Sequence, residues 1–519
     1  MTAAGPGSHR QDRTGRRQMP AWLPLLAVLV VQALLSLRLV REDTAFQDEA
    51  LYLWAGHREI AHLLHGAPIP PFPAYFSGSP VLYPPLGAMA DSLGGLAGAR
   101  ILSLIFMLGA TGLLWSVARR MYGPVAAFMA AGLFAVLGPT LHLGAFATFD
   151  AMSVFLVALA TWCVVQAGDR RDATTWMVTA GVVLAVANAT AYASTIYDVV
   201  VILLALTLAY PDPGGKHAVR RCLTLLTAVV VLLSVGLLIG GSYYQTGVGQ
   251  TTLARVPGAA SPLAVLGDAL LWTGLVIVLA LAAVAFSAFR KEGWPRTLPL
   301  AVFAAAAMLG PLEQAHLHTA ASLNKHVGHG VWFAAIAAGY AIDRLIAAAP
   351  AGRSRTVTCG ACVVALSFPA TLGISQSTTF SSDWPNAATF IAILRPYINH
   401  GGRVLVEDPS IAEYYLKTAG TDWKRWSSTR NIVLPNGKST GGPSPSAGVV
   451  GPGNEGEFAV FLLRRYFSLV VLNFQDTTTL DLQLNKELEA DPKHWQIVSV
   501  VPYGPTPGTY VIWQYRQHP

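Results

Sequence analysis

The chain has 519 residues, of which 53% are hydrophobic and only 12% charged, and its mean hydropathy is +0.46. These values exclude an ordinary soluble enzyme and predict a polytopic α-helical membrane protein. The net charge of +7 comes with no basic stripe interleaved with aromatic residues, so no nucleic-acid partner is expected.

The membrane portion is predicted to occupy residues 21–375, after a basic tail over 1–20. The first apolar run, 21–40, is followed by no small-residue cleavage site, so it is expected to remain as a transmembrane helix. Ten further runs approach the length of roughly 20 residues that crosses a bilayer, which makes about eleven spans. These runs lie near 99–118, 124–142, 149–167, 174–192, 195–210, 222–242, 263–288, 298–312, 328–346 and 356–374.

The basic residues between these runs predict an orientation with the N-terminus in the cytoplasm. On that register the short outer connections contain only Arg255 and Lys325. The inner connections are rich in basic residues, as the positive-inside rule requires. They contain Arg119, Arg120, Arg170, Arg171, Lys216, Arg220, Arg221, Arg290, Lys291, Arg296, Arg344, Arg353 and Arg355.

An odd number of spans places the end of the chain outside the cytoplasm, where residues 380–519 are predicted to form a small α/β domain. Strand-like segments such as "RVLVE", "SLVVLNF", "WQIVSVV" and "TYVIWQY" alternate there with helix-like ones, "IAEYYLKTA" and "TLDLQLNKELEA". A Gly/Pro/Ser-rich stretch at about 435–456 predicts a flexible loop in this domain. The domain contains no cysteine, so it is not a disulfide scaffold.

The first external loop, 41–98, is far longer than the other outer connections, which indicates that it builds a site. It begins with an adjacent acidic pair, Asp48 and Glu49. An amphipathic helix, "LYLWAGHREIAHLLHG", is expected next, and then a Pro/Gly segment, "YFSGSPVLYPPLG", suited to re-entering the interface.

Further polar residues are predicted in the same outer layer. Asp150 lies at the turn between the third and fourth spans, and acids at membrane depth usually face a cavity or a partner. A cluster between the ninth and tenth spans adds cations that suit an anionic leaving group. This cluster contains His316, His318, Lys325, His326 and His329.

Together these features resemble a known family. The F-x-D-E-x-x-Y string from Phe46 to Tyr52, the later acid Asp150 and the external C-terminal domain are similar to the GT-C glycosyltransferases of the protein O-mannosyltransferase and aminoarabinose-transferase type. The resemblance covers residues 1–375. It implies a sugar donor carried on polyprenyl phosphate and an acceptor protein, lipid or polysaccharide outside the cytoplasm.

The resemblance also implies roles for individual residues. Asp48 matches the catalytic base, Glu49 and Tyr52 complete the motif, and Asp150 matches a second acid that shapes the acceptor or metal site. Relatives of the aminoarabinose type often carry Lys before the Pro-Pro of the loop, where this chain has Tyr83. Other cations are then needed for the donor phosphate, and the candidates are Lys325 and His326, with His316 and His318 nearby.

The chemistry expected from these residues is direct displacement at a sugar carbon. A hydroxyl is a poor nucleophile, so a carboxylate such as Asp48 must accept its proton, while fixed cations stabilise the departing phosphate. Such an attack inverts the anomeric centre. The acids and histidines are compatible with a divalent metal ion, but no ligand spacing requires one.

Two other classes of function remain open at this stage. A secondary transporter is also polytopic, but it is expected to show repeated halves and acids at the midplane. A non-catalytic lipid-binding or scaffolding component of an envelope polysaccharide system is expected to keep the fold without depending on Asp48. Each of these proteins belongs in the plasma membrane and contacts membrane lipids.

Overall fold

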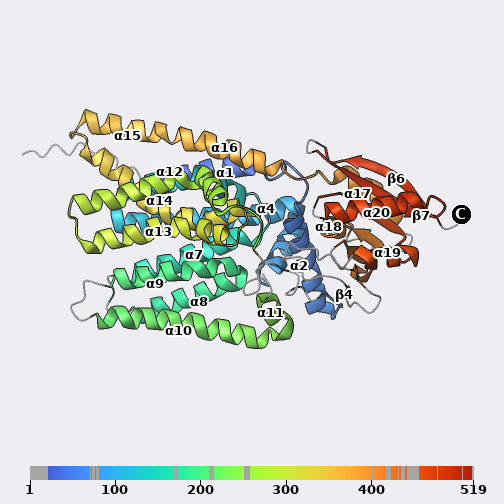
Figure 1. Ribbon diagram of the computed structural model, residues 1–519. Helices are drawn as coiled ribbons and strands as arrows, with labels where there is room; N and C mark the ends of the chain where they lie inside the picture. The colour runs from blue at the N-terminus through green and yellow to red at the C-terminus, as the bar shows by residue number, and fades with distance from the viewer. Residues whose placement is uncertain are drawn as a thin grey trace, which may run out of the picture.

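The computed structural model shows a long bundle of helices and a smaller domain of strands and helices, with the helix α2 lying where the two meet (Figure 1). The basic tail lies outside the described residues, as does nearly all of the predicted loop at 435–456. The described residues are 22–70, 72, 76, 81–168, 170, 173–209, 215–249, 257–398, 401–416, 422–429, 432–433, 439–440, 455–475, 477–504 and 507–516.

The bundle consists of helices that coincide with the apolar runs of the sequence. Each predicted run falls on one helix or on two consecutive helices, because in lipid a helix satisfies every backbone hydrogen bond within the segment. The bounds are α1 (Leu23–Leu37), α2 (Gln47–His65), α4 (Tyr83–Tyr122), α5 (Pro124–Val136), α6 (Gly138–Leu143), α7 (Phe149–Ala167), α8 (Thr174–Thr190), η1 (Tyr192–Tyr197), α9 (Asp198–Thr207), α10 (Lys216–Ile239), α11 (Gly241–Val248), α12 (Pro262–Phe289), α13 (Trp294–His316), α14 (Leu323–Ala348), α15 (Arg353–Ala365) and α16 (Ser367–Ser381).

Seven candidate spans among the described residues are long and apolar enough to cross a membrane, if α15 and α16 count as one. Others, such as α1, α5 and α8, are equally apolar in character but shorter. The predicted fold class is confirmed as a mostly helical membrane architecture with a small C-terminal sheet domain. The number of about eleven spans and the orientation of the termini stay predictions.

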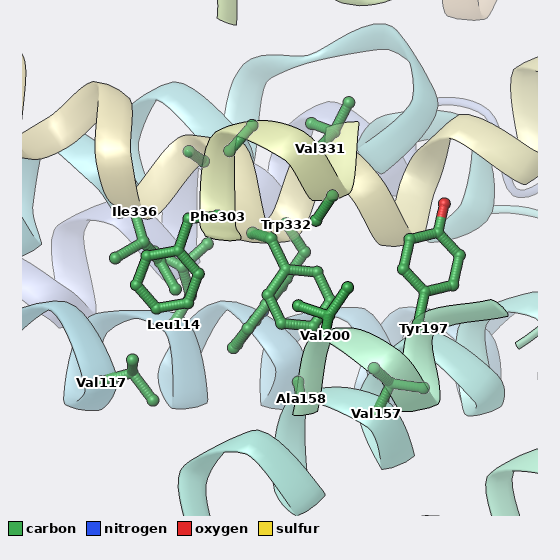
Figure 2. Close-up of a cluster of buried hydrophobic side chains, with 14 of the residues drawn as sticks. Leu114, Val117, Val157, Ala158, Tyr197, Val200, Phe303, Val331, Trp332 and Ile336 are labelled. Carbon is green, nitrogen blue, oxygen red and sulfur yellow. The ribbon is translucent and has the colours of Figure 1, made fainter. Parts of the chain in front are cut away.

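The helix α14 forms the centre of the bundle. Every residue from Val331 to Tyr340 is buried, and α14 packs on α5, α7, α12 and α13. Figure 2 shows this core, where Trp332 and Ile336 of α14 meet Leu114 of α4 and Phe303 of α13. Side chains from these three helices thus fill the interior of the bundle, and this packing fixes the position of α14.

Small residues allow this close packing. A Cβ at Gly339 would lie 2.5 Å from the carbonyl oxygen of Ala126 on α5, and one at Gly330 would lie 2.7 Å from that of Ala306 on α13. Backbones that approach so closely gain van der Waals contact, which is the main attraction between helices in lipid.

The predicted external loop, 41–98, is mostly helical in its described part. The predicted amphipathic helix coincides with α2, and Tyr83, Pro84 and Pro85 begin α4. Most of the expected Pro/Gly segment before them lies outside the described residues, and its re-entry into the interface stays a prediction. Proline suits the first turn of a helix, where its missing N–H group leaves no bond unmade. α4 is then bent at Gly94 and Gly95, and Gly95 has a φ of 62°.

The C-terminal domain is a layered α/β unit, as predicted. Its mixed sheet has the strand order β2-β1-β5-β7-β6; β1 pairs in parallel with β2 and β5, and β7 pairs antiparallel with β5 and β6. The elements are α17 (Ala388–Ile398), β1 (Val404–Val406), α18 (Ser410–Tyr415), η4 (Trp423–Arg425), β2 (Trp426–Ser428), β3 (Ile432–Val433), β4 (Ser439–Thr440), α19 (Glu455–Leu463), β5 (Leu469–Leu472), α20 (Thr478–Ala490), β6 (Trp495–Pro502) and β7 (Thr509–Tyr515).

The central strands of this sheet are buried on both faces. Val404 and Val406 of β1 join a core with α17 and α18, whereas Leu405 joins a core with α19 and α20. Successive side chains of a strand point to opposite faces, so a continuous apolar run such as "VLV" is what a doubly covered strand requires. The chain leaves β1 towards α18, which packs on α2.

Candidate active site

The acidic pair lies in the first turn of α2, where the positive end of the helix dipole favours negative charge. Adjacent helical residues point about 100° apart, so the two carboxylates face different surroundings. The side chain of Asp48 is 30% exposed, whereas that of Glu49 is fully buried. The pair is therefore two separate groups with separate chemistry.

Glu49 is held in a closed set of hydrogen bonds. Its two oxygens accept from the Nε and Nη2 atoms of Arg100 at 2.8 and 2.7 Å, and they also accept the backbone N–H groups of Phe46 and Ala147. Glu49 thereby joins α2 to α4 and to the segment before α7. These contacts hold α2 in position, and a catalytic role for Glu49 stays a prediction.

Arg100 is a central residue of the site that the sequence analysis missed. It is only 2% exposed, and besides Glu49 it donates to the backbone carbonyl groups of Val40, Asp43 and Thr44. The available signal was a lone arginine inside the apolar run of α4, because a charged residue in such a run usually has a buried partner.

Asp48 forms an ion pair with Lys325, whose Nζ atom lies 2.6 Å from Asp48 Oδ2. Lys325 lies in the first turn of α14 and is 7% exposed, and its ammonium group lies 6.0 and 5.4 Å from the ring centres of Phe46 and Phe146. Two residues that are 277 positions apart in the sequence, the predicted base and the predicted phosphate-binding cation, are thus direct neighbours.

Asp150 lies beside this pair, as the sequence analysis expected. It occupies the first turn of α7, is buried, and accepts a hydrogen bond from the Thr148 hydroxyl at 2.7 Å. Asp48, Asp150 and Glu49 all interact electrostatically with the Lys325 ammonium. One cation therefore lies among three carboxylates, and only Asp48 bonds to it directly.

Two tyrosines line the same region. Tyr52 follows Asp48 by one helical turn and packs its ring against Phe76 and Phe149. Burial raises the pKa of Tyr52 well above its ordinary value, and the nearby charges of Asp48 and Asp150 act in the same direction, so its hydroxyl stays protonated. Tyr83, at the start of α4, is fully buried and interacts with Glu49 and Asp150.

The predicted histidines occupy several positions. His326 follows Lys325 in α14, and its carbonyl oxygen faces the Tyr197 hydroxyl. His316 is exposed at the end of α13, and a ring nitrogen of His318 lies 3.1 Å from the carbonyl oxygen of Ala260. The contact of His318 is thus with the segment before α12, and its predicted role in substrate binding stays a prediction, as does that of His316.

Two other buried histidines also lie near Lys325. His329, one turn after Lys325, bonds to Ser153, which is one turn after Asp150, at 2.9 Å. His142, which the sequence analysis missed, interacts electrostatically with Lys325, and its Nε2 atom is buried with no hydrogen-bond partner among the described residues. α7 and α14 therefore contact each other through the bond between Ser153 and His329, one turn beyond Asp150 and Lys325.

A divalent metal ion in this site stays a prediction. The described residues contain no group of three His, Cys, Asp or Glu side chains placed to hold one. Lys325 already lies against the Asp48 carboxylate, where a metal ion would compete with it.

The C-terminal domain and the segment leading into it hold the residues just before Asp48. The Tyr415 hydroxyl accepts the N–H group of Ala45 at 2.7 Å, and Asp408 accepts from the Gln47 side chain. The carbonyl group of Thr44 accepts from the indole N–H of Trp384 at 3.0 Å. The strand ends and α18 of this domain thus fix the approach to the acidic pair.

A second junction lies on the other side of α2. The buried Asp91 of α4 accepts at 2.5 Å from the Tyr414 hydroxyl of α18, and His57 of α2 contacts it at the same distance. Asp91 therefore links α2, α4 and the C-terminal domain through one carboxylate.

The comparisons with known proteins agree with this architecture. Residues 92–239 match the family described as dolichyl-phosphate-mannose-protein mannosyltransferase. ArnT from Cupriavidus metallidurans bound to undecaprenyl phosphate is 15% identical with a TM-score of 0.56, over 95% of this chain and 98% of that one. No curated protein shows detectable sequence similarity.

A second group of similar structures comes from Archaeoglobus fulgidus. Its oligosaccharyltransferase in the apo form is 15% identical with a TM-score of 0.56, over 95% of this chain and 74% of that one. AglB in complex with an inhibitory peptide and a dolichol-phosphate is also 15% identical, over the same shares, with a TM-score of 0.53. The fold is therefore that of the GT-C glycosyltransferases, the predicted resemblance is confirmed, and the chain is a multi-pass membrane protein.

Proposed function

We propose that this protein is a membrane glycosyltransferase that moves a sugar from a polyprenyl-phosphate donor to an acceptor hydroxyl on the extracytoplasmic face. The observation that carries the proposal is the contact between Asp48 and Lys325, which puts a carboxylate and a cation 2.6 Å apart beside Asp150. The named neighbours ArnT and AglB, with undecaprenyl phosphate and dolichol-phosphate, support the donor class.

The reaction balances with these groups alone. The acceptor oxygen forms a bond to the anomeric carbon and gives its proton to an oxygen of Asp48. The bond from that carbon to the phosphate oxygen breaks, and its electron pair stays on the phosphate, which gains one negative charge. Lys325 stabilises this charge, and attack from the side opposite the leaving group inverts the sugar centre.

The ion pair also indicates an order of events. An ammonium bonded to Asp48 is only partly available to a phosphate, and a carboxylate bonded to an ammonium is a weaker base. When the donor phosphate binds, it takes over Lys325 and leaves Asp48 free to accept a proton. On this mechanism the donor binds first and prepares the base for the acceptor.

Asp150 and the buried tyrosines complete the site. Asp150 interacts electrostatically with the Lys325 ammonium and, in this mechanism, lies beside the acceptor. The high pKa of Tyr52 keeps its hydroxyl as a hydrogen-bond donor at neutral pH, which suits contact with a sugar or phosphate oxygen. The acids at one end of the bundle do not favour a transporter, in which they are expected at the midplane.

The test is a transfer assay with the wild-type protein in membranes and a panel of radiolabelled polyprenyl-phosphate sugars. We expect one donor to be consumed, with the product anomer opposite to that of the donor by NMR. Transfer with a retained anomer would contradict direct displacement. No transfer from any donor would favour the lipid-binding or scaffolding alternative.

A further inference from the structure

A groove on the outer face of the bundle runs between α8 and α10, far from the acidic pair. It has a volume of about 1040 Å³ and is lined for most of its length by apolar side chains. Val178 and Val182 of α8 form one wall, and Leu223 and Val231 of α10 form the other. All four side chains are exposed in the isolated chain.

In a membrane this groove opens to lipid. α10 forms the edge of the bundle in Figure 1, and only 11% of its most apolar window is buried. An exposed apolar helix of this length is covered by acyl chains in a bilayer. A recess between two such helices is therefore filled by a lipid chain lying along them.

One end of the groove is cationic. Lys216 and Arg220 line it there, and because they are four residues apart they lie on the same side of α10. They also lie at the N-terminus of the helix, where the dipole adds positive potential. Neither is paired with a carboxylate among the described residues.

The neighbouring Arg221 shows that these two cations differ from an ordinary structural arginine. Its guanidinium donates to the backbone carbonyl groups of Gly168 and Arg170, which ties α10 to the end of α7. Lys216 and Arg220 instead line the recess and keep their charge available to a ligand.

We propose that this groove binds an anionic phospholipid, with its phosphate between Lys216 and Arg220 and an acyl chain along the apolar walls. The match is one of charge and shape together, since a long apolar channel that ends in two cations complements one lipid of this class. The cationic end lies at the end of the bundle away from α2 (Figure 1). The lipid is therefore separate from the donor that we assign to Lys325.

The test compares lipids and variants by native mass spectrometry of the purified full-length chain, with phosphatidylglycerol and phosphatidylcholine as probes. We expect phosphatidylglycerol to bind more tightly. A basic residue near a membrane surface contributes roughly 1 kcal/mol, so Lys216→Gln with Arg220→Gln is expected to weaken phosphatidylglycerol binding about thirtyfold. Binding of phosphatidylcholine is expected to stay unchanged.

A matched control is the pair Arg353→Gln and Arg355→Gln, which removes two cations from the N-terminus of another exposed helix, α15. We expect this control to keep wild-type lipid binding. A second variant, Val182→Trp, fills the groove and leaves the cations, and it is also expected to lose the lipid. Equal loss in the control, full binding with the groove filled, or equal binding of the two lipids would overturn the proposal.

Discussion

The buried pair of Glu49 and Arg100 predicts a measurable loss of order in the segment that carries Asp48. The variant Glu49→Gln keeps the shape of the side chain and an oxygen that can accept the N–H group of Ala147. It removes the negative charge, so the guanidinium of Arg100, which is 2% exposed, is left buried without its counterion.

The free-energy cost of Glu49→Gln follows from the contacts of Arg100. Removing one partner of a buried ion pair costs about 3–5 kcal/mol. Arg100 keeps three backbone carbonyl acceptors after the change, so the lower end applies, about 3 kcal/mol. At about 1.36 kcal/mol for each tenfold change, local opening becomes about 150-fold more frequent.

Hydrogen exchange measures this opening directly, because the N–H groups of Phe46 and Ala147 both donate to Glu49. In Glu49→Gln, peptides that contain these two amides are expected to exchange about 150-fold faster. The control Arg296→Gln removes an exposed arginine whose nearest carboxylate oxygen is 3.7 Å away, and it is expected to leave both peptides unchanged. Wild-type protection in Glu49→Gln would refute the role assigned to the pair.

Three further predictions concern neighbouring residues. Lys325→Gln is expected to lower transfer by about 10²-fold or more and to raise the KM for the donor, because the departing phosphate loses its cation; unchanged initial rates would contradict this. Tyr415→Phe leaves the N–H group of Ala45 without its acceptor, which costs about 1–3 kcal/mol of stability in the segment before Asp48. We therefore expect kcat to fall while donor binding in a filter assay persists. Parallel loss of kcat and donor binding would indicate general unfolding. Burial raises the pKa of Glu59 from 4.5 to about 8. Between these two pH values the folded chain keeps the proton on Glu59 and the unfolded chain has lost it, so the free energy of unfolding falls as the pH rises from 4.5 to about 8. Glu59→Gln is expected to flatten that decline in thermal unfolding measured from pH 5 to pH 9, and an unaltered slope would count against it.

The transmembrane helices could be predicted from the sequence because a long apolar run has one favourable backbone conformation in lipid. The run at 149–167 coincides with α7, and Asp150 lies in its first turn, as expected. Strands of the C-terminal domain could also be predicted, since "VLV" and "LVVL" have the composition of strands covered on both faces.

The pairings inside the site could not be predicted in the same way. The sequence contains no information on the distance between Asp48 and Lys325, and the roles predicted for the two residues do not require a contact between them. Arg100 lies 51 positions from Glu49, so neither helix periodicity nor local spacing connects them. Such contacts arise only from the packing of α2 against α4 and α14.

The contact between the C-terminal domain and the segment around α2 could not be predicted from the sequence either. Its strands were predicted, but its docking on the external loop depends on single polar contacts such as those of Tyr414 and Tyr415. These side chains lie in a short helix, α18, and nothing in the pattern of that helix indicates a partner in α4 or before α2.

The central claim is that Asp48 is the base of a sugar transfer, and one comparison tests it most directly. Transfer from the accepted polyprenyl-phosphate sugar is measured in membranes that contain equal amounts of wild-type protein, Asp48→Asn or the control Asp343→Asn, whose carboxylate instead pairs with Arg344. We expect Asp48→Asn to lose about 10²–10⁴-fold in rate while it still binds the donor, and the control to keep its activity. Equal transfer by Asp48→Asn and the wild type would remove Asp48 from the chemistry and contradict the mechanism.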